Sequence, residues 1–234
     1  DDNSHLWKCA PTFELNATSN KNLMNFDEDL NNDFLPIFGG KSFDIWNSDT
    51  GKYSGYVKKD LLIDFLIEKR RVKYKKLSLP DKKTENWLKD PKTLPIFRSR
   101  IAFRDVTRAT DSRTIRTALI PPLNTLNNTA RFLEFNEPSP KTEAYILGIM
   151  SSRIFDWMSR RHIELHADAH IFNSLSFPVY SEDDPLSKKI IHLVASICNQ
   201  DKRHSEWVRC IGNVNEFNDK DHKDNAIFML DALV

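Results

Sequence analysis

The sequence predicts an α+β fold: a twisted, mostly antiparallel sheet with flanking helices, followed by a helical C-terminal extension. Three segments, residues 96–106, 114–120 and 130–135, have the extended, apolar composition of strands. The second of them ends at Pro121-Pro122, which cannot continue a central strand ladder. From Lys141 onward the apolar residues recur at helical spacing instead. We therefore expect the sheet to precede most of the helices along the chain.

The part before this sheet is more polar. Its first segment, residues 1–34, is rich in Asn, Asp and Ser, which predicts irregular structure. Two short extended segments, 42–46 and 53–57, are joined by a turn-forming sequence and predict a hairpin. Apolar residues at helical spacing predict an amphipathic helix over 59–71, and the Lys-rich sequence from 72 to 95 predicts a long connection.

After the sheet, the spacing predicts one long helix from Lys141 to Met158, preceded by Pro140. Further helices are expected from Pro185, over 205–211 and over 225–234. We expect four large residues of the long helix to pack in the core: Tyr145, Leu147, Phe155 and Trp157.

Composition narrows the class of protein. With 234 residues, 40% of them hydrophobic and 29% charged, the chain has the length and balance of an ordinary globular protein. No apolar segment is long enough to span a bilayer. The three cysteines are odd in number and lack Cys-x-x-Cys spacing, so neither a disulfide framework nor a zinc ribbon is indicated. A cytoplasmic location fits best.

Positive charge is concentrated in one segment although the formal net charge is only +1. Residues 98–116 hold six arginines against two aspartates. On a strand, side chains at i and i+2 share a face, so Arg98, Arg100 and Arg104 align while Ile101 and Phe103 face the core. Two more arginines fall in the turn beyond the strand: Arg108 and Arg113. Because the planar guanidinium grips phosphate and guanine edges, the cluster indicates nucleic-acid binding, with structural Arg–Asp pairs as the alternative.

A second basic run lies at residues 69–76. It supplies five further candidate DNA contacts: Arg70, Arg71, Lys73, Lys75 and Lys76. Basic segments of this kind give sequence-independent affinity through release of counterions from the phosphate backbone. The alternative is a solvated helix end whose cations complement the helix dipole.

Several segments also carry a family pattern, in the order 35–44, 100–114, 118–122, 145–157 and 173–178. The first reads Leu-Pro-Ile-Phe-Gly-Gly-Lys-Ser-Phe-Asp and adds Lys41 to the candidate DNA contacts. The second reads Arg-Ile-Ala-Phe-Arg-Asp-Val-Thr-Arg-Ala-Thr-Asp-Ser-Arg-Thr. Together they resemble the specificity region of large bacterial restriction-modification DNA methyltransferases of the type IIG, Eco57I-like and phage-exclusion class.

The resemblance implies a target-recognition domain over residues 35–180, with an irregular segment at 1–34 before it and a helical extension at 181–234 after it. In this family such a domain binds double-stranded DNA and selects the sequence for an upstream N6-adenine methyltransferase domain of the same chain. Target selection of this kind combines base readout with flipping of the target adenine. The resemblance implies that the parent enzyme would use S-adenosylmethionine, and it leaves open whether the parent also cleaves DNA.

The catalytic motifs of that family are missing here. The sequence holds no Asn-Pro-Pro-Tyr or Asp-Pro-Pro-Tyr loop, and no Gly-containing loop for S-adenosylmethionine. We therefore expect this chain to be a fragment of a longer enzyme. The fragment itself should bind no cofactor and contain no catalytic residues. The alternative function is a protein-interaction or assembly module of a phage-defence system, which the near-neutral charge keeps open.

A metal site is suggested by His162, His166 and His170, which are spaced four residues apart. The sequence lacks the His-Glu-x-x-His motif, because Glu164 at i+2 would point away from the histidine face. We expect no metal to be bound by this chain.

Overall fold

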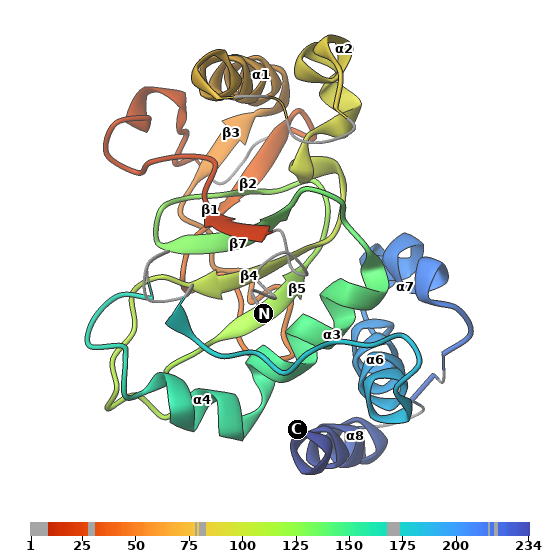
Figure 1. The fold of residues 1–234 in the computed structure, drawn as a ribbon. Coiled ribbons are helices and arrows are strands. Elements are labelled where there is room, and N and C mark those ends of the chain that lie inside the picture. The colour runs from red at the N-terminus through yellow and green to blue at the C-terminus, as the bar shows by residue number, and fades with distance from the viewer. Residues whose placement is uncertain are drawn as a thin grey trace.

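Figure 1 shows the computed structural model of the chain, which describes residues 9–27, 31–77, 79, 83–167, 174–214, 216–217 and 220–234. Within these ranges the fold is α+β, as predicted. A four-stranded sheet lies at the centre, with a three-stranded sheet on one side and helices on the other. No helix in these ranges combines the length and apolarity needed to cross a bilayer.

The central sheet has the strand order β1-β7-β4-β5, and all neighbours are antiparallel. Its strands are β1 (Cys9–Thr12), β4 (Arg100–Arg104), β5 (Thr117–Ile120) and β7 (Ala130–Phe135). The three strands predicted between residues 96 and 135 are confirmed. The N-terminal strand was not predicted: residues 1–34 were expected to be irregular, yet Cys9 pairs opposite Phe135 at the sheet edge. The polar sequence around β1 gave no strand pattern, and its partner strand β7 is remote in sequence.

The smaller sheet has the order β3-β2-β6, with β2 antiparallel to β3 and parallel to β6. Its strands are β2 (Phe34–Phe38), β3 (Tyr56–Lys58) and β6 (Thr125–Leu126). The predicted hairpin of 42–46 with 53–57 is wrong: β3 overlaps only the end of the second segment, and its antiparallel partner is β2. The first segment, 42–46, is a loop whose Phe43 is fully buried, so its apolar content reflects packing of a turn rather than a strand.

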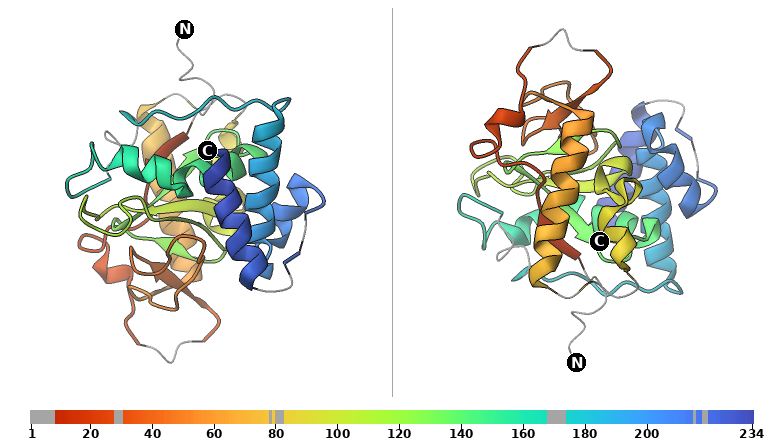
Figure 2. Two further views of the ribbon diagram at one scale, coloured as in Figure 1. Left: turned by 90° about the horizontal axis from the view of Figure 1, so that it is seen from below. Right: turned by 90° about the horizontal axis from the view of Figure 1, so that it is seen from above.

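Helix α1 (Lys59–Lys76) covers the smaller sheet and confirms the predicted helix while extending it to Lys76. Its inner residues Leu62 and Leu66 pack with Leu35 and Ile37 of β2. The predicted long connection is partly regular, since it contains α2 (Glu85–Lys89) and the 3-10 turns η3 (Pro91–Thr93) and η4 (Pro95–Phe97). Figure 2 shows these elements beside α1.

The predicted long helix is two helices, α3 (Pro140–Ser151) and α4 (Arg153–Ser159). Ser152 separates them because its backbone is extended, with ψ 153°, and its side chain accepts a hydrogen bond from the Phe155 amide. Serine caps helix N-termini in this way, so the chain changes direction after α3. Tyr145, Leu147 and Phe155 are buried as predicted.

The C-terminal helices pack on α3 and complete the main core. They are α6 (Pro185–Cys198), α7 (Ser205–Ile211) and α8 (Lys220–Leu233), with the 3-10 turn η5 (Lys202–His204) before α7. Gly148 lets α3 and α6 approach closely, since a Cβ there would lie 2.8 Å from Cγ2 of Ile190. The helices share one apolar cluster with the central sheet, so the extension is an integral layer of the fold.

Candidate nucleic-acid interface

Arg100 lies in the interior, which corrects the predicted exposed face of Arg98, Arg100 and Arg104. Its side chain is 0% exposed and donates to the carboxylate of Glu14 and to the carbonyl and side-chain oxygens of Asn124 at 3.0 and 2.7 Å. Burial lowers the pKa of Arg100, and the charge of Glu14 opposes that shift. The expected alternation fails because the second face of β4 is also covered, so Arg100 cannot reach a phosphate in this conformation.

Glu14 completes this buried pair from the N-terminal segment. Its second carboxylate oxygen accepts from the Leu126 amide at 2.7 Å and from the Thr125 hydroxyl at 3.0 Å. A buried ion pair is tolerated when its remaining hydrogen-bonding capacity is met in this way. The pair therefore joins the N-terminal segment to β4 and β6.

Two more of the predicted arginines have structural partners. Arg98 donates to Glu143 of α3 at 2.9 Å, and the other oxygen of Glu143 accepts from the Trp207 indole at 2.7 Å. Arg113 donates to the carbonyl oxygens of Ser151 and Ser152 at the C-terminal end of α3, where the helix dipole favours a cation. The structural alternative is thus realised at both positions.

Arg104 differs, because it combines a structural contact with access to a cleft. Its Nη2 donates to the Phe43 carbonyl at 2.9 Å and lies 3.4 Å from Asp44. Asp44 is itself bound by Arg116, with both carboxylate oxygens 2.8 Å from Nη1. Burial acts to raise the pKa of Asp44, but the bond from Arg116 and the nearby guanidinium of Arg104 lower it overall.

A cleft of about 410 Å³ opens beside Arg104. It is lined by Gly40, Lys41, Lys52, Tyr53, Ser54, Arg104, Val106 and Thr129. Three of these side chains are cationic and three carry a hydroxyl, whereas none is acidic. Such a lining offers hydrogen-bond donors and positive charge to an anion, and a backbone phosphate is an anion of suitable size.

Two glycines shape this cleft by close approach. A Cβ on Gly39 would lie 2.4 Å from the Ser54 Oγ, and one on Gly40 would lie 3.1 Å from the Thr129 carbonyl. The turn is held by the Gly39 amide, which donates to Ser42 at 2.9 Å, and the Gly40 amide, which donates to Thr129 at 3.0 Å. The Gly-Gly-Lys sequence thus brings Lys41 to the rim of the cleft.

Three exposed cations have no acidic partner among the residues that the structure describes. They are Lys41 and Lys52 at the rim and Arg108 on the loop that follows β4. The sequence predicted Lys41 and Arg108, but not Lys52 or the hydroxyls of Ser54 and Thr129. Lys52 does follow the predicted turn, but only the fold places it in the same cleft as Arg104.

Most cations of the basic run on α1 have partners within the fold. Arg70 donates to the Trp87 carbonyl at 2.9 Å and to the Thr93 hydroxyl at 2.8 Å, and it stacks 4.2 Å from the centre of the Trp87 ring. Arg70 therefore connects the segment that contains α2 to α1 through hydrogen bonds and ring stacking. Two other cations have acidic partners: Arg71 pairs with Glu68 and Lys73 with Glu134, each at 2.9 Å.

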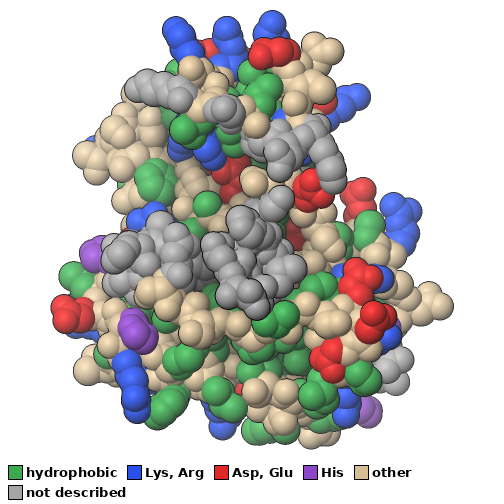
Figure 3. Space-filling model, in the orientation of Figure 1, with side chains coloured by type: hydrophobic (Ala, Val, Ile, Leu, Met, Phe, Trp, Pro, Cys, Tyr) green, Lys and Arg blue, Asp and Glu red, His purple; other side chains and the backbone are tan. Residues whose placement is uncertain are grey.

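Lys75 is exposed, and the Lys76 side chain lies outside the described part of the chain. Figure 3 shows Lys and Arg side chains over α1 at the top of the view, above a hollow in the surface. A hollow next to α1 is lined by Lys69, Arg70, Lys73 and Glu134, among others. The acidic Glu134 within it makes this hollow a poorer anion site than the cleft beside Arg104.

The histidines do not form a metal centre in the part of the chain that is described. His166 Nδ1 lies 3.0 Å from Asp105, which also binds Arg131, and His162 is exposed. His170 falls outside the described residues. No group of three or more His, Cys, Asp or Glu side chains with metal-binding geometry occurs in the described ranges.

The predicted burial of Trp157 is wrong. Its side chain is 60% exposed on α4, and the Arg161 guanidinium lies 4.4 Å from its ring centre. The break at Ser152 turns α4 away from the direction of α3, so the helical spacing no longer points Trp157 at the core. The neighbouring Ile154 and Phe228 are exposed as well.

We expect Trp157→Ala to change the free energy of unfolding by less than about 1 kcal/mol, because an exposed cation–π contact contributes only about 0.5–1 kcal/mol. Urea unfolding followed by circular dichroism measures the change. A loss of about 3 kcal/mol or more would contradict the exposed position, since only a buried Trp costs that much.

The similarity of this chain to known proteins lies in structure rather than in sequence. No protein-family model matches the chain, and no curated protein matches its sequence. A solved structure of the Type IIL restriction-modification enzyme MmeI in complex with DNA is similar over 97% of this chain, with 14% sequence identity and a TM-score of 0.45. The chain spans 32% of the length of that enzyme chain.

Proposed function

We propose that the chain is a DNA-recognition domain that binds duplex DNA through the cleft beside Arg104. The observation that carries this proposal is a cleft lined by Lys41, Lys52 and Arg104 and by no acidic side chain. Arg108, on the loop that follows β4, is a further exposed cation, although it does not line the cleft. Charges that already have partners gain little from phosphate, whereas Lys41, Lys52 and Arg108 have no acidic partner among the described residues.

The finer assignment follows from the family resemblance in the sequence. The domain would select the target site for an N6-adenine methyltransferase domain that lies upstream in a longer protein. That partner domain would supply S-adenosylmethionine binding and the chemistry, and the present chain would supply duplex binding and base readout. The arginine-rich segment would contribute indirectly, by building the sheet that positions the cleft.

The test is duplex binding by a variant that carries Lys41→Ala, Lys52→Ala and Arg108→Ala. We expect its affinity for a mixed-sequence duplex at low salt to fall at least about tenfold. The slope of log affinity against log salt should decrease by about 0.9 for each phosphate that the variant no longer neutralises. Fluorescence anisotropy at several salt concentrations measures both quantities.

The matched control removes three exposed lysines elsewhere: Lys92→Ala, Lys188→Ala and Lys189→Ala. It changes the net charge equally, so a purely global electrostatic effect would weaken both variants alike. If the two variants bind with the same affinity and salt slope, the cleft is not the interface.

A second candidate function is a protein-interaction module. The specific observation is the exposed apolar surface of Ile154 and Trp157 on α4, with Phe228 on α8 close by through Arg153, which lies 5.8 Å from the Phe228 ring centre. Exposed apolar patches of this kind are typical of protein interfaces. Failure of the unmodified chain to bind any duplex at low salt would favour this second function.

A further inference from the structure

One wall of the cleft beside Arg104 is formed by the loop that joins β2 to β3. This cleft loop, residues 40–54, supplies five of the lining residues: Gly40, Lys41, Lys52, Tyr53 and Ser54. The Thr50 hydroxyl donates to the Lys41 carbonyl at 2.6 Å. The Ser42 hydroxyl donates to the Lys52 carbonyl at 2.5 Å. The position of the cleft loop therefore determines where two of the three cations of the cleft lie.

Asp49 holds the part of the cleft loop that carries Lys52. Its Oδ1 accepts from the Gly51 amide at 2.9 Å, and both of its carboxylate oxygens lie 3.1 Å from the Tyr53 hydroxyl. Gly51 has φ 72°, a left-handed conformation that glycine adopts without strain. Burial and the charge of Asp49 raise the pKa of Tyr53 to about 12, so this hydroxyl stays a donor at neutral pH. Asp49 thus binds the residues on both sides of Lys52.

Arg203, in the turn η5 between α6 and α7, holds Asp49 in turn. Its Nη1 donates to Asp49 at 2.8 Å, while its Nε and Nη2 donate to Asp201 at 2.8–3.1 Å. The side chain of Asp49 is only 12% exposed. A planar guanidinium that uses different nitrogens for two carboxylates fixes their relative position. The C-terminal layer therefore sets the place of the Asp49 carboxylate.

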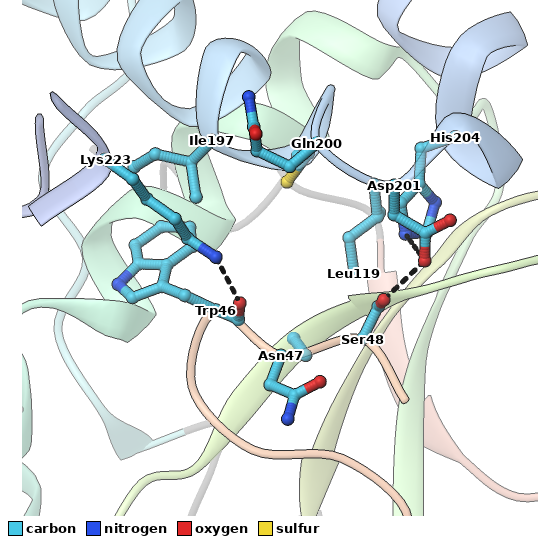
Figure 4. Close-up of a pocket in the computed structure, with 11 residues that line it drawn as sticks. Trp46, Asn47, Ser48, Leu119, Ile197, Gln200, Asp201, His204 and Lys223 are labelled. Atoms are coloured by element: carbon cyan, nitrogen blue, oxygen red, sulfur yellow. Dashed lines mark hydrogen bonds and ion pairs between the residues drawn. The ribbon is translucent and has the colours of Figure 1, made fainter. Parts of the chain in front are cut away.

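Two neighbouring residues of the cleft loop are bound by the same layer. Asp201 accepts from the Ser48 hydroxyl at 2.6 Å, and Lys223 of α8 donates to the Trp46 carbonyl at 3.1 Å. Figure 4 shows both contacts, with the loop on one side and the C-terminal residues on the other. An isolated exposed ion pair contributes little, whereas several charges that form a network hold a segment more firmly.

We propose that Asp49 is a positioning residue for DNA binding, which keeps Lys52 at the wall of the cleft and is itself held by Arg203. The proposal rests on the proposed function, because it concerns the same cleft. Asp49 does not line the cleft, and its charge is paired with Arg203. Its placement of Lys52 therefore outweighs the repulsion between its carboxylate and a phosphate. The C-terminal helices thereby take part in forming the DNA-binding surface.

The test is Asp49→Ala, because positioning and simple electrostatics predict opposite results for it. Removing an acid raises the net charge, which alone would strengthen DNA binding. We expect weaker binding instead: the affinity for a mixed-sequence duplex at low salt should fall at least about fivefold, and the slope of log affinity against log salt should decrease by about 0.9, the contribution of one phosphate contact. Fluorescence anisotropy measures both quantities, and circular dichroism shows that the variant is folded in the assay.

Three further variants make the comparison specific. Asp183→Ala removes an exposed aspartate away from the cleft and should not weaken binding. Asp49→Asn keeps an oxygen that can accept from Gly51 and Tyr53, so it should recover part of the lost affinity. The double variant Asp49→Ala with Lys52→Ala should bind like Lys52→Ala alone, because a residue that acts through another adds no effect once that residue is gone.

Binding of Asp49→Ala as tight as that of the unmodified chain would overturn the proposal. An unchanged salt slope, or additive effects of Asp49→Ala and Lys52→Ala, would overturn it too, since a general loss of stability moves neither the slope nor the coupling. If the variant of Lys41, Lys52 and Arg108 binds like its control, the proposed function fails and this proposal falls with it. If that variant weakens binding as expected while Asp49→Ala does not, the positioning role alone is refuted.

Discussion

Replacing Arg100 with methionine should lower the free energy of unfolding by about 3–5 kcal/mol. The substitution leaves the Glu14 carboxylate buried beside an apolar side chain, and removing one partner of a buried ion pair carries a penalty of that size. The two hydrogen bonds to Asn124 disappear as well. Urea unfolding, with the slope of the transition checked for two-state behaviour, gives the difference.

Two further variants show whether the penalty comes from the stranded carboxylate. The double variant Arg100→Met with Glu14→Gln should recover part of the stability, because no charge then remains buried. Arg71→Met, which breaks the exposed pair with Glu68, should cost less than about 1 kcal/mol. A destabilisation below about 1 kcal/mol for Arg100→Met would show that its guanidinium reaches solvent and is available for DNA.

Acidification should destabilise the protein through His204, by about 3 kcal/mol between pH 7 and pH 4. Burial lowers the pKa of His204 from its ordinary value of 6.5 to about 4. Between these two values the unfolded chain binds a proton that the folded chain does not, so stability falls as the pH falls. The difference of about 2.5 pKa units, at 1.36 kcal/mol each, gives the expected decrease.

His204→Asn removes this titration while keeping a side-chain group that can bond to Ser99. Its stability should therefore fall less steeply than that of the unmodified chain between about pH 7 and pH 4. His192→Asn, at an exposed position on α6, is the control and should follow the unmodified profile. Parallel profiles for all three proteins would show that His204 does not remain neutral in the fold.

The elements that the sequence predicted are those fixed by local patterns. The strand at 130–135 is a short, mainly apolar segment rich in Phe, and the helix that begins at Pro185 has a proline at its first position and a regular apolar face. Both patterns act between neighbours in sequence. Ser152, by contrast, interrupts an apolar pattern that otherwise continues, so its role as a cap was visible only in the backbone geometry.

The roles of the arginines depended on partners that no local pattern reveals. Whether Arg100 faces water or an acid was decided by Glu14, which lies 86 residues earlier. Lys41 and Arg108 were predicted as candidate DNA contacts. Both are exposed, and neither has an acidic partner among the described residues. The cleft itself combines residues from four separate segments, so its shape required the fold.

The pairing of β1 with β7 has a consequence for the order in which the protein folds during synthesis. Cys9 and Phe135 are opposite one another, so the central sheet cannot acquire its edge strand until residues near 135 have left the ribosome. Until then β1 has no strand partner. Contacts this distant along the chain slow folding. While β1 is not yet paired, the exposed edge of β7 could pair with a neighbouring chain or be bound by a chaperone.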